Sequence, residues 1–165
     1  MMILKHQACL LLGSNIEPEI NIPRAVSLLQ AKLTIVRVSS VYETPSADCC
    51  YPNYLNMAVL VSTELDRQNL RDRILRPLEA SMGRVRSDDK NASRTIDLDI
   101  ILFDGQVIDS EIWQQVHVAV PVSELLPSCR DQTGRILKNV AHTLARTMTI
   151  QPRPDVTIPL PSNTH

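Results

Sequence analysis

The spacing of apolar residues changes twice along the first third of the chain, which predicts a strand, a helix and a second strand. The apolar run at residues 8–12 ends in a Gly-Ser-Asn turn and predicts a buried strand. Residues 18–32 carry apolar side chains at helical spacing, and Pro23 predicts that the regular helix begins near that position. Residues 34–44 are rich in β-branched side chains and predict the second strand.

The same pattern returns in the middle of the chain. Residues 54–63 are apolar at nearly every position, which predicts a central strand buried on both faces. Asp66 is a good N-cap for a helix that runs to residue 82, and Pro77 should kink that helix or remove one of its hydrogen bonds. In residues 95–103 apolar and acidic side chains alternate, which predicts a further strand.

The predicted order is therefore strand, helix, strand, strand, helix, strand. This order predicts an α+β protein with the ferredoxin-like split βαβ (βαββαβ) fold and an antiparallel sheet. Residues 106–147 are expected to add a short strand and one or two helices at the C-terminal side. We expect one domain over residues 1–148, followed by a proline-rich, poorly ordered tail at 149–165.

Composition and charge narrow the class of protein. The 165 residues include 17 Lys and Arg against 18 Asp and Glu, a net charge of -1 that favours neither nucleic acid nor an anionic membrane. The apolar runs are too short to span a bilayer, and the N-terminus lacks the pattern of a signal peptide. None of the four cysteines forms a CxxC pair, so we expect reduced thiols and a cytoplasmic protein.

The sharpest chemical feature is the pair of carboxylates at Asp97 and Asp99. Since side chains on a strand alternate with a period of two, both carboxylates point to the same face. Two neighbouring carboxylates repel each other unless a divalent cation bridges them, and Mg²⁺ prefers such oxygen ligands together with phosphate. The alternative is that the pair forms the solvated face of a half-buried strand.

Three arginines, Arg84, Arg86 and Arg94, flank this pair. Guanidinium groups bind phosphate oxygens bidentately, so arginines beside two acids, with a flexible loop at residues 87–93 between them, indicate a site for a metal and a polyphosphate. The alternative is that the arginines form surface ion pairs with Asp88 and Asp89.

A second candidate site lies around the end of the second strand. Thr44 and Pro45, with Tyr54 and Asn56, flank a loop that could surround a small planar molecule. Tyr54 could stack on it, and the Asn56 amide offers the donors and acceptors that the edge of a heterocycle needs. Alternatively, Tyr54 is a core aromatic and Asn56 a turn or edge residue.

These motifs together resemble one enzyme family. The carrying segments are Leu-Gly-Ser-Asn at residues 12–15, Ser-Ser-Val-Tyr-Glu-Thr-Pro at 39–45, Tyr-Leu-Asn at 54–56, Glu79 with Gly-Arg-Val-Arg at 83–86, and Arg-Thr-Ile-Asp-Leu-Asp-Ile at 94–100. Over residues 8–127 the chain resembles the 6-hydroxymethyl-7,8-dihydropterin pyrophosphokinases of folate biosynthesis. The resemblance implies a ferredoxin-like enzyme that transfers pyrophosphate from ATP to a pterin alcohol and releases AMP.

The resemblance also implies roles for the site residues. Asp97 and Asp99 would hold two Mg²⁺ ions that bridge the phosphates of ATP. Arg84 and Arg94 would contact the phosphates and act with Asp97 in catalysis, whereas Arg86 and Glu79 would help to bind the nucleotide. The pterin would be bound by Thr44, Pro45, Tyr54 and Asn56. The implied partners are therefore small molecules, and we expect a monomer, with a dimer as the alternative.

The chain departs from the family pattern between residues 109 and 121, where it is several residues shorter. An ATP-contacting histidine and arginine and a pterin-stacking aromatic have no secure counterpart there. His117 could replace that histidine, or could take the position of the aromatic against the pterin. The shorter segment also leaves two alternatives open, a catalytically impaired relative and a kinase for a modified pterin.

Overall fold

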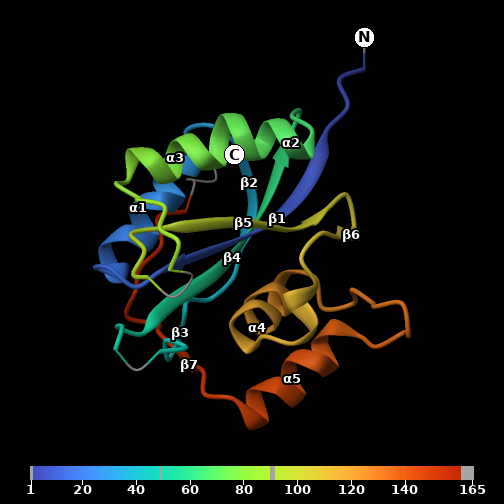
Figure 1. Ribbon diagram of the computed structural model, residues 1–165. Coiled ribbons are helices and arrows are strands. Elements are labelled where there is room, and N and C mark those ends of the chain that lie inside the picture. The colour runs from blue at the N-terminus through green and yellow to red at the C-terminus, as the bar shows by residue number, and fades with distance from the viewer. Residues whose placement is uncertain (1, 49, 90–91, 161–165) are drawn as a thin grey trace.

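The computed structural model describes residues 2–48, 50–89 and 92–160, and shows a mixed sheet-and-helix protein (Figure 1). The strands are β1 His6–Ser14, β2 Thr34–Val38, β3 Tyr42–Thr44, β4 Tyr54–Thr63, β5 Asp97–Phe103, β6 Gln106–Val107 and β7 Gln151–Pro152. The helices are α1 Pro18–Gln30, α2 Arg67–Asn69, α3 Arg76–Ser81, α4 Val116–Leu125 and α5 Leu137–Thr147. A π-helical turn at Leu70–Leu75 joins α2 to α3, and a 3₁₀ turn spans Ser110–Trp113.

The strands form one antiparallel sheet in the order β6-β5-β1-β4-β3-β7, with β2 also paired to β4. The first strand thus lies between the last strand of the split βαβ unit and the central hairpin strand, as the ferredoxin-like arrangement requires. The predicted fold class is confirmed, including the added C-terminal strand and helices.

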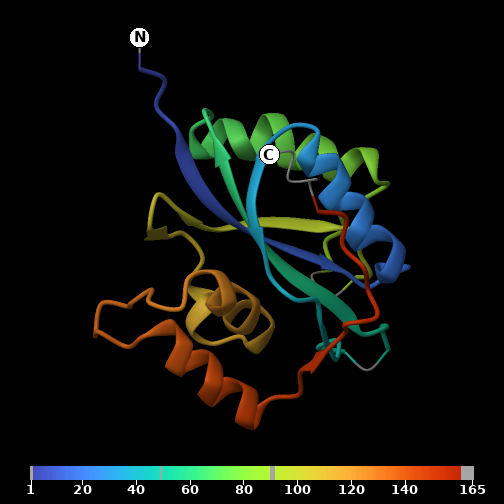
Figure 2. The same cartoon turned by 180° about the vertical axis from the view of Figure 1, so that it is seen from behind.

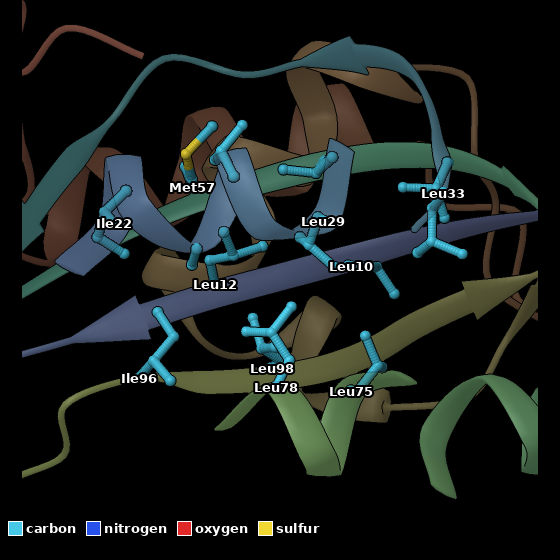
Figure 3. Close-up of a cluster of buried hydrophobic side chains, with 14 of the residues drawn as sticks. Leu10, Leu12, Ile22, Leu29, Leu33, Met57, Leu75, Leu78, Ile96 and Leu98 are labelled. Atoms are coloured by element: carbon cyan, nitrogen blue, oxygen red, sulfur yellow. The ribbon is translucent and has the colours of Figure 1, made fainter. Parts of the chain in front are cut away.

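Helices cover both faces of the sheet, as the two opposite views show (Figures 1 and 2). One core packs β1 side chains such as Leu10 and Leu12 against α1 and the helical segment 67–81 (Figure 3). The other core packs Cys9 and Leu11 of the same strand against α4 and α5. Because β1 is buried on both faces, its sequence is a continuous apolar run rather than an alternating one.

Two elements differ in detail from the predicted ones, and the start of a third agrees. The helix α1 begins at Pro18 and includes Pro23, because its buried residues hold it against the sheet although Pro23 cannot donate a backbone hydrogen bond. The predicted strand at 34–44 is divided into β2 and β3. Val38 pairs with Val59 and Tyr42 with Asn56, so the chain advances four residues here while β4 advances three, and the pairing is interrupted between the two strands. Asp66 caps the next helix as predicted, accepting a hydrogen bond from the Asn69 amide.

Pro77 is accommodated at the start of α3, directly after the π-helical turn. In a π-helical turn each backbone amide donates to the carbonyl five residues earlier, whereas in an α-helix it donates to the carbonyl four residues earlier. Single turns of this kind occur within α-helices as local bulges. The expected kink thus takes the form of a π-helical segment that precedes the proline.

The segment after α5 differs from the poorly ordered tail that its prolines predicted. Gln151 and Pro152 form β7 beside β3, and the Arg153 amide donates to the carbonyl of Val41 at 2.8 Å. The Arg153 guanidinium pairs with Glu19, Glu43 and Asp155, while Val156 is buried in the core. Charge pairing and one buried apolar residue therefore hold residues 151–156, which a count of prolines could not reveal; residues 161–165 of the tail lie outside the described residues.

Candidate active site

The two predicted carboxylates lie on β5, on the face of the sheet that α4 only partly covers. Asp97 is paired with Gly13 of β1 and Asp99 with Leu11, while Leu98 between them packs into the opposite core. Asp97 and Asp99 line the cavity on the α4 side of the sheet, which Leu98 does not, so they share one face as the strand period predicts.

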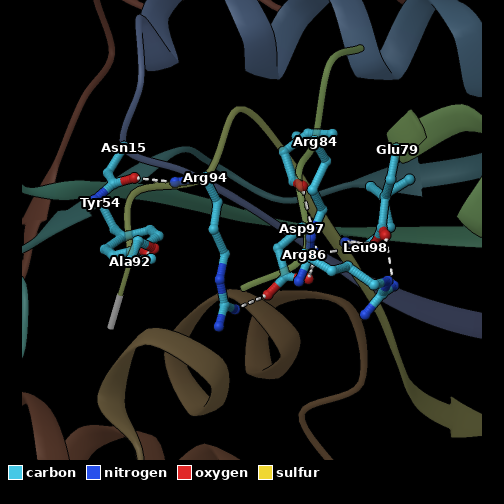
Figure 4. A network of polar contacts seen from close by, with 10 residues as sticks. Asn15, Tyr54, Glu79, Arg84, Arg86, Ala92, Arg94, Asp97 and Leu98 are labelled. Atoms are coloured by element: carbon cyan, nitrogen blue, oxygen red, sulfur yellow. Dashed lines mark hydrogen bonds and ion pairs between the residues drawn. The ribbon is translucent and has the colours of Figure 1, made fainter. Parts of the chain in front are cut away.

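Asp97 forms ion pairs with Arg84 and Arg94, one on each carboxylate oxygen (Figure 4). The Arg84 side chain is only 10% exposed, so its charge depends on these carboxylates. Repulsion between Asp97 and Asp99 alone would suggest that replacing Asp97 leaves the fold unaffected. The two ion pairs change this expectation, because the replacement would take one of its two carboxylate partners from the nearly buried Arg84 guanidinium.

Glu79 is a buried residue that braces the carboxylate strand. Its Oε1 accepts a hydrogen bond from the Leu98 amide at 2.9 Å and lies 3.2 Å from Arg84, while Oε2 lies 3.1 Å from Arg86. The outer edge of β5 is open at Leu98, since β6 pairs only with Leu102 and Phe103. Burial raises the pKa of Glu79, against the opposing effects of these hydrogen-bond and arginine partners.

Asn15, from the predicted turn after β1, fixes the start of the Arg94 segment. Its side chain accepts a hydrogen bond from the Arg94 amide at 2.7 Å, and its own amide donates to the Arg94 carbonyl at 3.1 Å. The Leu-Gly-Ser-Asn motif therefore acts by holding a segment 79 residues further along the chain.

Asp99 keeps solvent contact but has an unfavourable electrostatic environment. Desolvation of its carboxylate, followed by the negative charges of Asp97, Glu79 and Asp109, raises the pKa of Asp99 well above the usual range of an aspartate. A cation placed beside Asp99 would relieve this repulsion.

The first cavity lies between β5 and the helical segment 67–81 and has a volume of about 630 Å³. It is lined by Glu79, the three predicted arginines and both aspartates, and also by Arg67, Arg71 and Arg76, which the sequence analysis missed. The available signal was the spacing of Arg67 and Arg71, which places both on one helix face. This cavity suits a polyanion.

The second cavity lies on the α4 face of the sheet and has a volume of about 610 Å³. All four residues predicted to surround a planar molecule line it: Thr44, Pro45, Tyr54 and Asn56. Its other wall comes from residues 115–118 and 148–149, so the shortened segment still borders the site. Asn56 is buried and donates to the Thr44 hydroxyl at 3.3 Å.

Gly13 forms part of the floor of this second cavity. It is paired with Asn56 on one side and Asp97 on the other, and a Cβ atom added to it would lie 2.9 Å from the Asn56 Oδ1 atom. Glycine at this position therefore makes room for the Asn56 amide.

The two cavities meet at the carboxylates, because Arg94, Asp97, Asp99 and Asp109 line both. Among the described residues, no three His, Cys, Asp or Glu side chains cluster as a closed metal site. Two carboxylates at an open junction nevertheless fit Mg²⁺, which commonly takes one or two protein carboxylates and completes its shell with phosphate and water. The fold and site are those expected of a two-substrate enzyme, with a cavity suited to a polyanion and one suited to a smaller polar molecule on either side of a carboxylate pair.

Comparison with known proteins identifies the family. Residues 9–127 match the family described as 7,8-dihydro-6-hydroxymethylpterin-pyrophosphokinase (HPPK), and the chain belongs to that family. It is 35% identical over 134 residues to the 2-amino-4-hydroxy-6-hydroxymethyldihydropteridine pyrophosphokinase of Bacillus subtilis, covering 74% of this chain and 79% of that protein. The identity to the protein of the same name from Pseudomonas aeruginosa is 33% over 138 residues, 76% of this chain and 84% of that one.

Solved structures agree on the fold. A crystal structure of Plasmodium falciparum HPPK-DHPS superposes with a TM-score of 0.71 at 11% identity, covering 87% of this chain and 46% of that chain. The chain thus spans just under half of that protein, and at this identity the likeness concerns the fold alone. The family, enzyme class and fold that the motifs predicted are confirmed. The described part of the chain contains no helix that is long and apolar enough to cross a bilayer.

Proposed function

We propose that this protein transfers the pyrophosphoryl group of ATP to the hydroxymethyl oxygen of 6-hydroxymethyl-7,8-dihydropterin, giving AMP and the pterin diphosphate. The observation that carries the proposal is the junction of two cavities at Asp97 and Asp99, with the arginines on one side and Asn56 on the other. Transfer between two bound molecules requires the donor and acceptor to approach in one site, and this junction supplies it.

On the nucleotide side, we propose that Arg84 and Arg94 exchange their ion pairs with Asp97 for contacts with the phosphates when ATP binds. Both guanidinium groups lie at the carboxylates already, so little rearrangement is needed for them to contact a polyphosphate there. Arg86 is proposed to bind the phosphates, and Glu79 to position Arg84, Arg86 and the β5 backbone. Asp97 and Asp99 would hold two Mg²⁺ ions, which neutralise charge on the phosphates.

On the pterin side, Asn56 is proposed to hydrogen-bond to the edge of the ring, with Thr44 fixing the orientation of its amide. Tyr54 and Pro45 would contact the faces of the ring. The hydroxymethyl oxygen would then point toward the junction, where Asp97 can orient it.

The chemical step is an in-line attack of the pterin oxygen on the β-phosphorus. The bond from the β-phosphorus to the oxygen that joins it to the α-phosphate breaks, AMP leaves with that oxygen, and the hydroxyl proton passes to solvent. Phosphoryl transfer depends mainly on positioning and charge stabilisation, so Arg84 and Arg94 contribute by opposing the negative charge that develops.

The test is the release of AMP from ATP in the presence of Mg²⁺ and the reduced pterin alcohol, followed by chromatography. We expect one AMP per pterin diphosphate formed. Absence of turnover together with calorimetric binding of both substrates would instead identify a catalytically impaired relative, and binding only of a substituted pterin would identify a kinase for a modified substrate.

We also propose that the protein acts as a cytoplasmic monomer whose functional unit is residues 1–148. The small-molecule cavities are both formed largely within this range, with Thr149 as the exception. Light scattering coupled to gel filtration gives the oligomeric state, and truncation after residue 148 tests the boundary.

A further inference from the structure

His117 lies at the start of α4 and lines the second cavity, together with Thr44, Pro45, Tyr54 and Asn56. His117 is not among the described residues that line the first, arginine-rich cavity. Of the two roles that the shortened segment left open for His117, this placement favours the one beside the planar ligand.

The imidazole of His117 is half-buried, and no hydrogen bond joins it to another of the described residues. Two nearby polar side chains are engaged within the protein: Asn56 donates to Thr44, and Asp109 accepts from the Glu111 amide. His117 is also absent from the described polar atoms that are sealed from solvent and unpaired, so its ring nitrogens reach open space. A polar group left unpaired beside a cavity is available to a ligand.

The helix that carries the imidazole is fixed at both ends, and burial disfavours the charged form of the ring. Next to His117, Val118 is buried in the core that α4 and α5 share, and the far end of α4 is fixed where Glu124 accepts hydrogen bonds from the Tyr42 hydroxyl and the Ser40 amide. Burial lowers the pKa of His117, with only Asp109 opposing this effect. A neutral imidazole offers one donor and one acceptor.

We propose that His117 is a specificity-determining residue that hydrogen-bonds to the polar edge of a planar heterocycle in the second cavity, across from Asn56. The proposal rests on the proposed function and names a residue by which the site selects a ring that carries both donors and acceptors. An aromatic hydrocarbon side chain here would supply a stacking face only, so the imidazole adds a hydrogen bond to the recognition of the ring.

The experiment is calorimetric titration of the full chain with 6-hydroxymethyl-7,8-dihydropterin in the presence of Mg²⁺ and a non-hydrolysable ATP analogue. His117→Phe keeps a planar ring without nitrogen, and His117→Gln keeps a donor and an acceptor without the ring. His142→Phe, at an exposed histidine of α5 away from both cavities, is the matched control. We expect about tenfold weaker pterin binding for His117→Phe, less than about threefold for His117→Gln, and no change for His142→Phe.

Affinity for the ATP analogue, measured alone, should stay within about twofold in every variant, which separates the pterin contact from a general loss of structure. Should His117→Phe fail to fold, His117→Ala takes its place with the same expectation. Wild-type affinity in His117→Phe, or equal losses in the Phe and Gln variants, would overturn the role of His117 as a hydrogen-bonding residue. Failure of the unmodified protein to bind the pterin would overturn the proposed function and the inference with it.

Discussion

The two cavities that meet at Asp97 and Asp99 differ in charge, so they suit ligands of different kinds. The first is lined by six arginines, Arg67, Arg71, Arg76, Arg84, Arg86 and Arg94, which compensate the four carboxylates of Glu79, Asp97, Asp99 and Asp109 and leave an excess of positive charge. Among the described residues, the second is lined by one arginine, Arg94, and otherwise by polar and apolar side chains, the shared acids and Glu111. A polyanion is held by charge in the first, whereas a neutral ring must be held in the second by shape and by hydrogen bonds.

Because the two cavities differ in this way, substitutions in one or the other should change different constants in steady-state kinetics. A change in the first cavity should raise the KM for ATP, a change in the second should raise the KM for the pterin, and a change at the junction should lower kcat. The following predictions test that separation.

The largest effect is expected at the junction, for Asp97→Ala. The variant loses the carboxylate that both cavities share, and AMP release should fall by about a thousandfold or more. It should also lose about 2–3 kcal/mol of stability, because the nearly buried Arg84 loses one of the two carboxylates that compensate its charge. Glu64→Ala, at an exposed site remote from both cavities, is the control for urea unfolding and activity. Full activity in Asp97→Ala would remove the junction from the mechanism.

The brace on the strand is tested by Glu79→Ala, which removes the acceptor of the Leu98 amide and the partner of Arg84 and Arg86. An ångström of displacement at a reacting group can cost about a hundredfold in rate, and we expect a loss of that order in kcat. A buried amide without an acceptor should also cost about 1–3 kcal/mol of stability. Glu79→Gln retains the acceptor but not the charge, so it should recover most of the stability and little of the activity. Equal recovery of both would indicate that Glu79 acts only as a structural residue.

The pterin side alone is tested by Gly13→Ala. The new methyl group would meet the Asn56 amide oxygen at 2.9 Å, so Asn56 must shift away from the hydroxyl of Thr44. We expect the KM for the pterin to rise about tenfold, with the KM for ATP nearly unchanged. An equal rise in both constants would show that the floor of the second cavity is not independent of the first.

The nucleotide side alone is tested by Arg76→Ala, with Arg73→Ala as the matched control. Both arginines are exposed on the same helical segment, but only Arg76 lines the first cavity. A partly solvated contact to a phosphate contributes up to about 1 kcal/mol, so the KM for ATP should rise about two- to fivefold in Arg76→Ala and stay constant in Arg73→Ala. Identical behaviour of the two variants would restrict phosphate binding to the arginines nearer the carboxylates.

The smallest effect concerns the pH dependence of stability. The folded protein raises the pKa of Asp99 above its unfolded value, so the ionised carboxylate destabilises the fold at high pH and this cost disappears as the pH falls and Asp99 takes up a proton. Without Mg²⁺, Asp99→Asn should therefore stabilise the protein at pH 8 by at most about 1 kcal/mol, since solvent screens the group, and by less near pH 5, where the folded aspartate is protonated but the unfolded one is still ionised. Thermal unfolding at both pH values provides the measurement, and a larger gain at pH 5 than at pH 8 would contradict the direction of the shift.

Local rules were sufficient for the parts of the molecule that depend on neighbours in sequence. The period of two placed Asp97 and Asp99 on one face, and the cap at Asp66 started its helix where expected. The motifs around Thr44 and Asn56 also predicted residues that line one cavity. The chemical roles of all these residues stay predictions until the variants are measured.

Contacts between distant segments were out of reach of such rules. Nothing in the sequence around Asn15 indicates that its side chain holds the Arg94 amide, and nothing around Arg153 indicates that it pairs with Glu19 of α1 and Glu43 of β3. The π-helical turn at Leu70–Leu75 has the same character, because a one-residue change in hydrogen bonding depends on how the helix packs. Tertiary packing decides these features, and local propensity does not encode it.

The short strand β7 has a consequence for the behaviour of the protein at high concentration. A sheet edge with unpaired amides can recruit a strand from another molecule and start aggregation. Here β7 occupies the outer side of β3 and ends in Pro152, a residue that cannot donate a backbone hydrogen bond. The C-terminal segment thus covers the edge of the sheet at β3. Removing it should make the protein prone to self-association even if both ligands still bind.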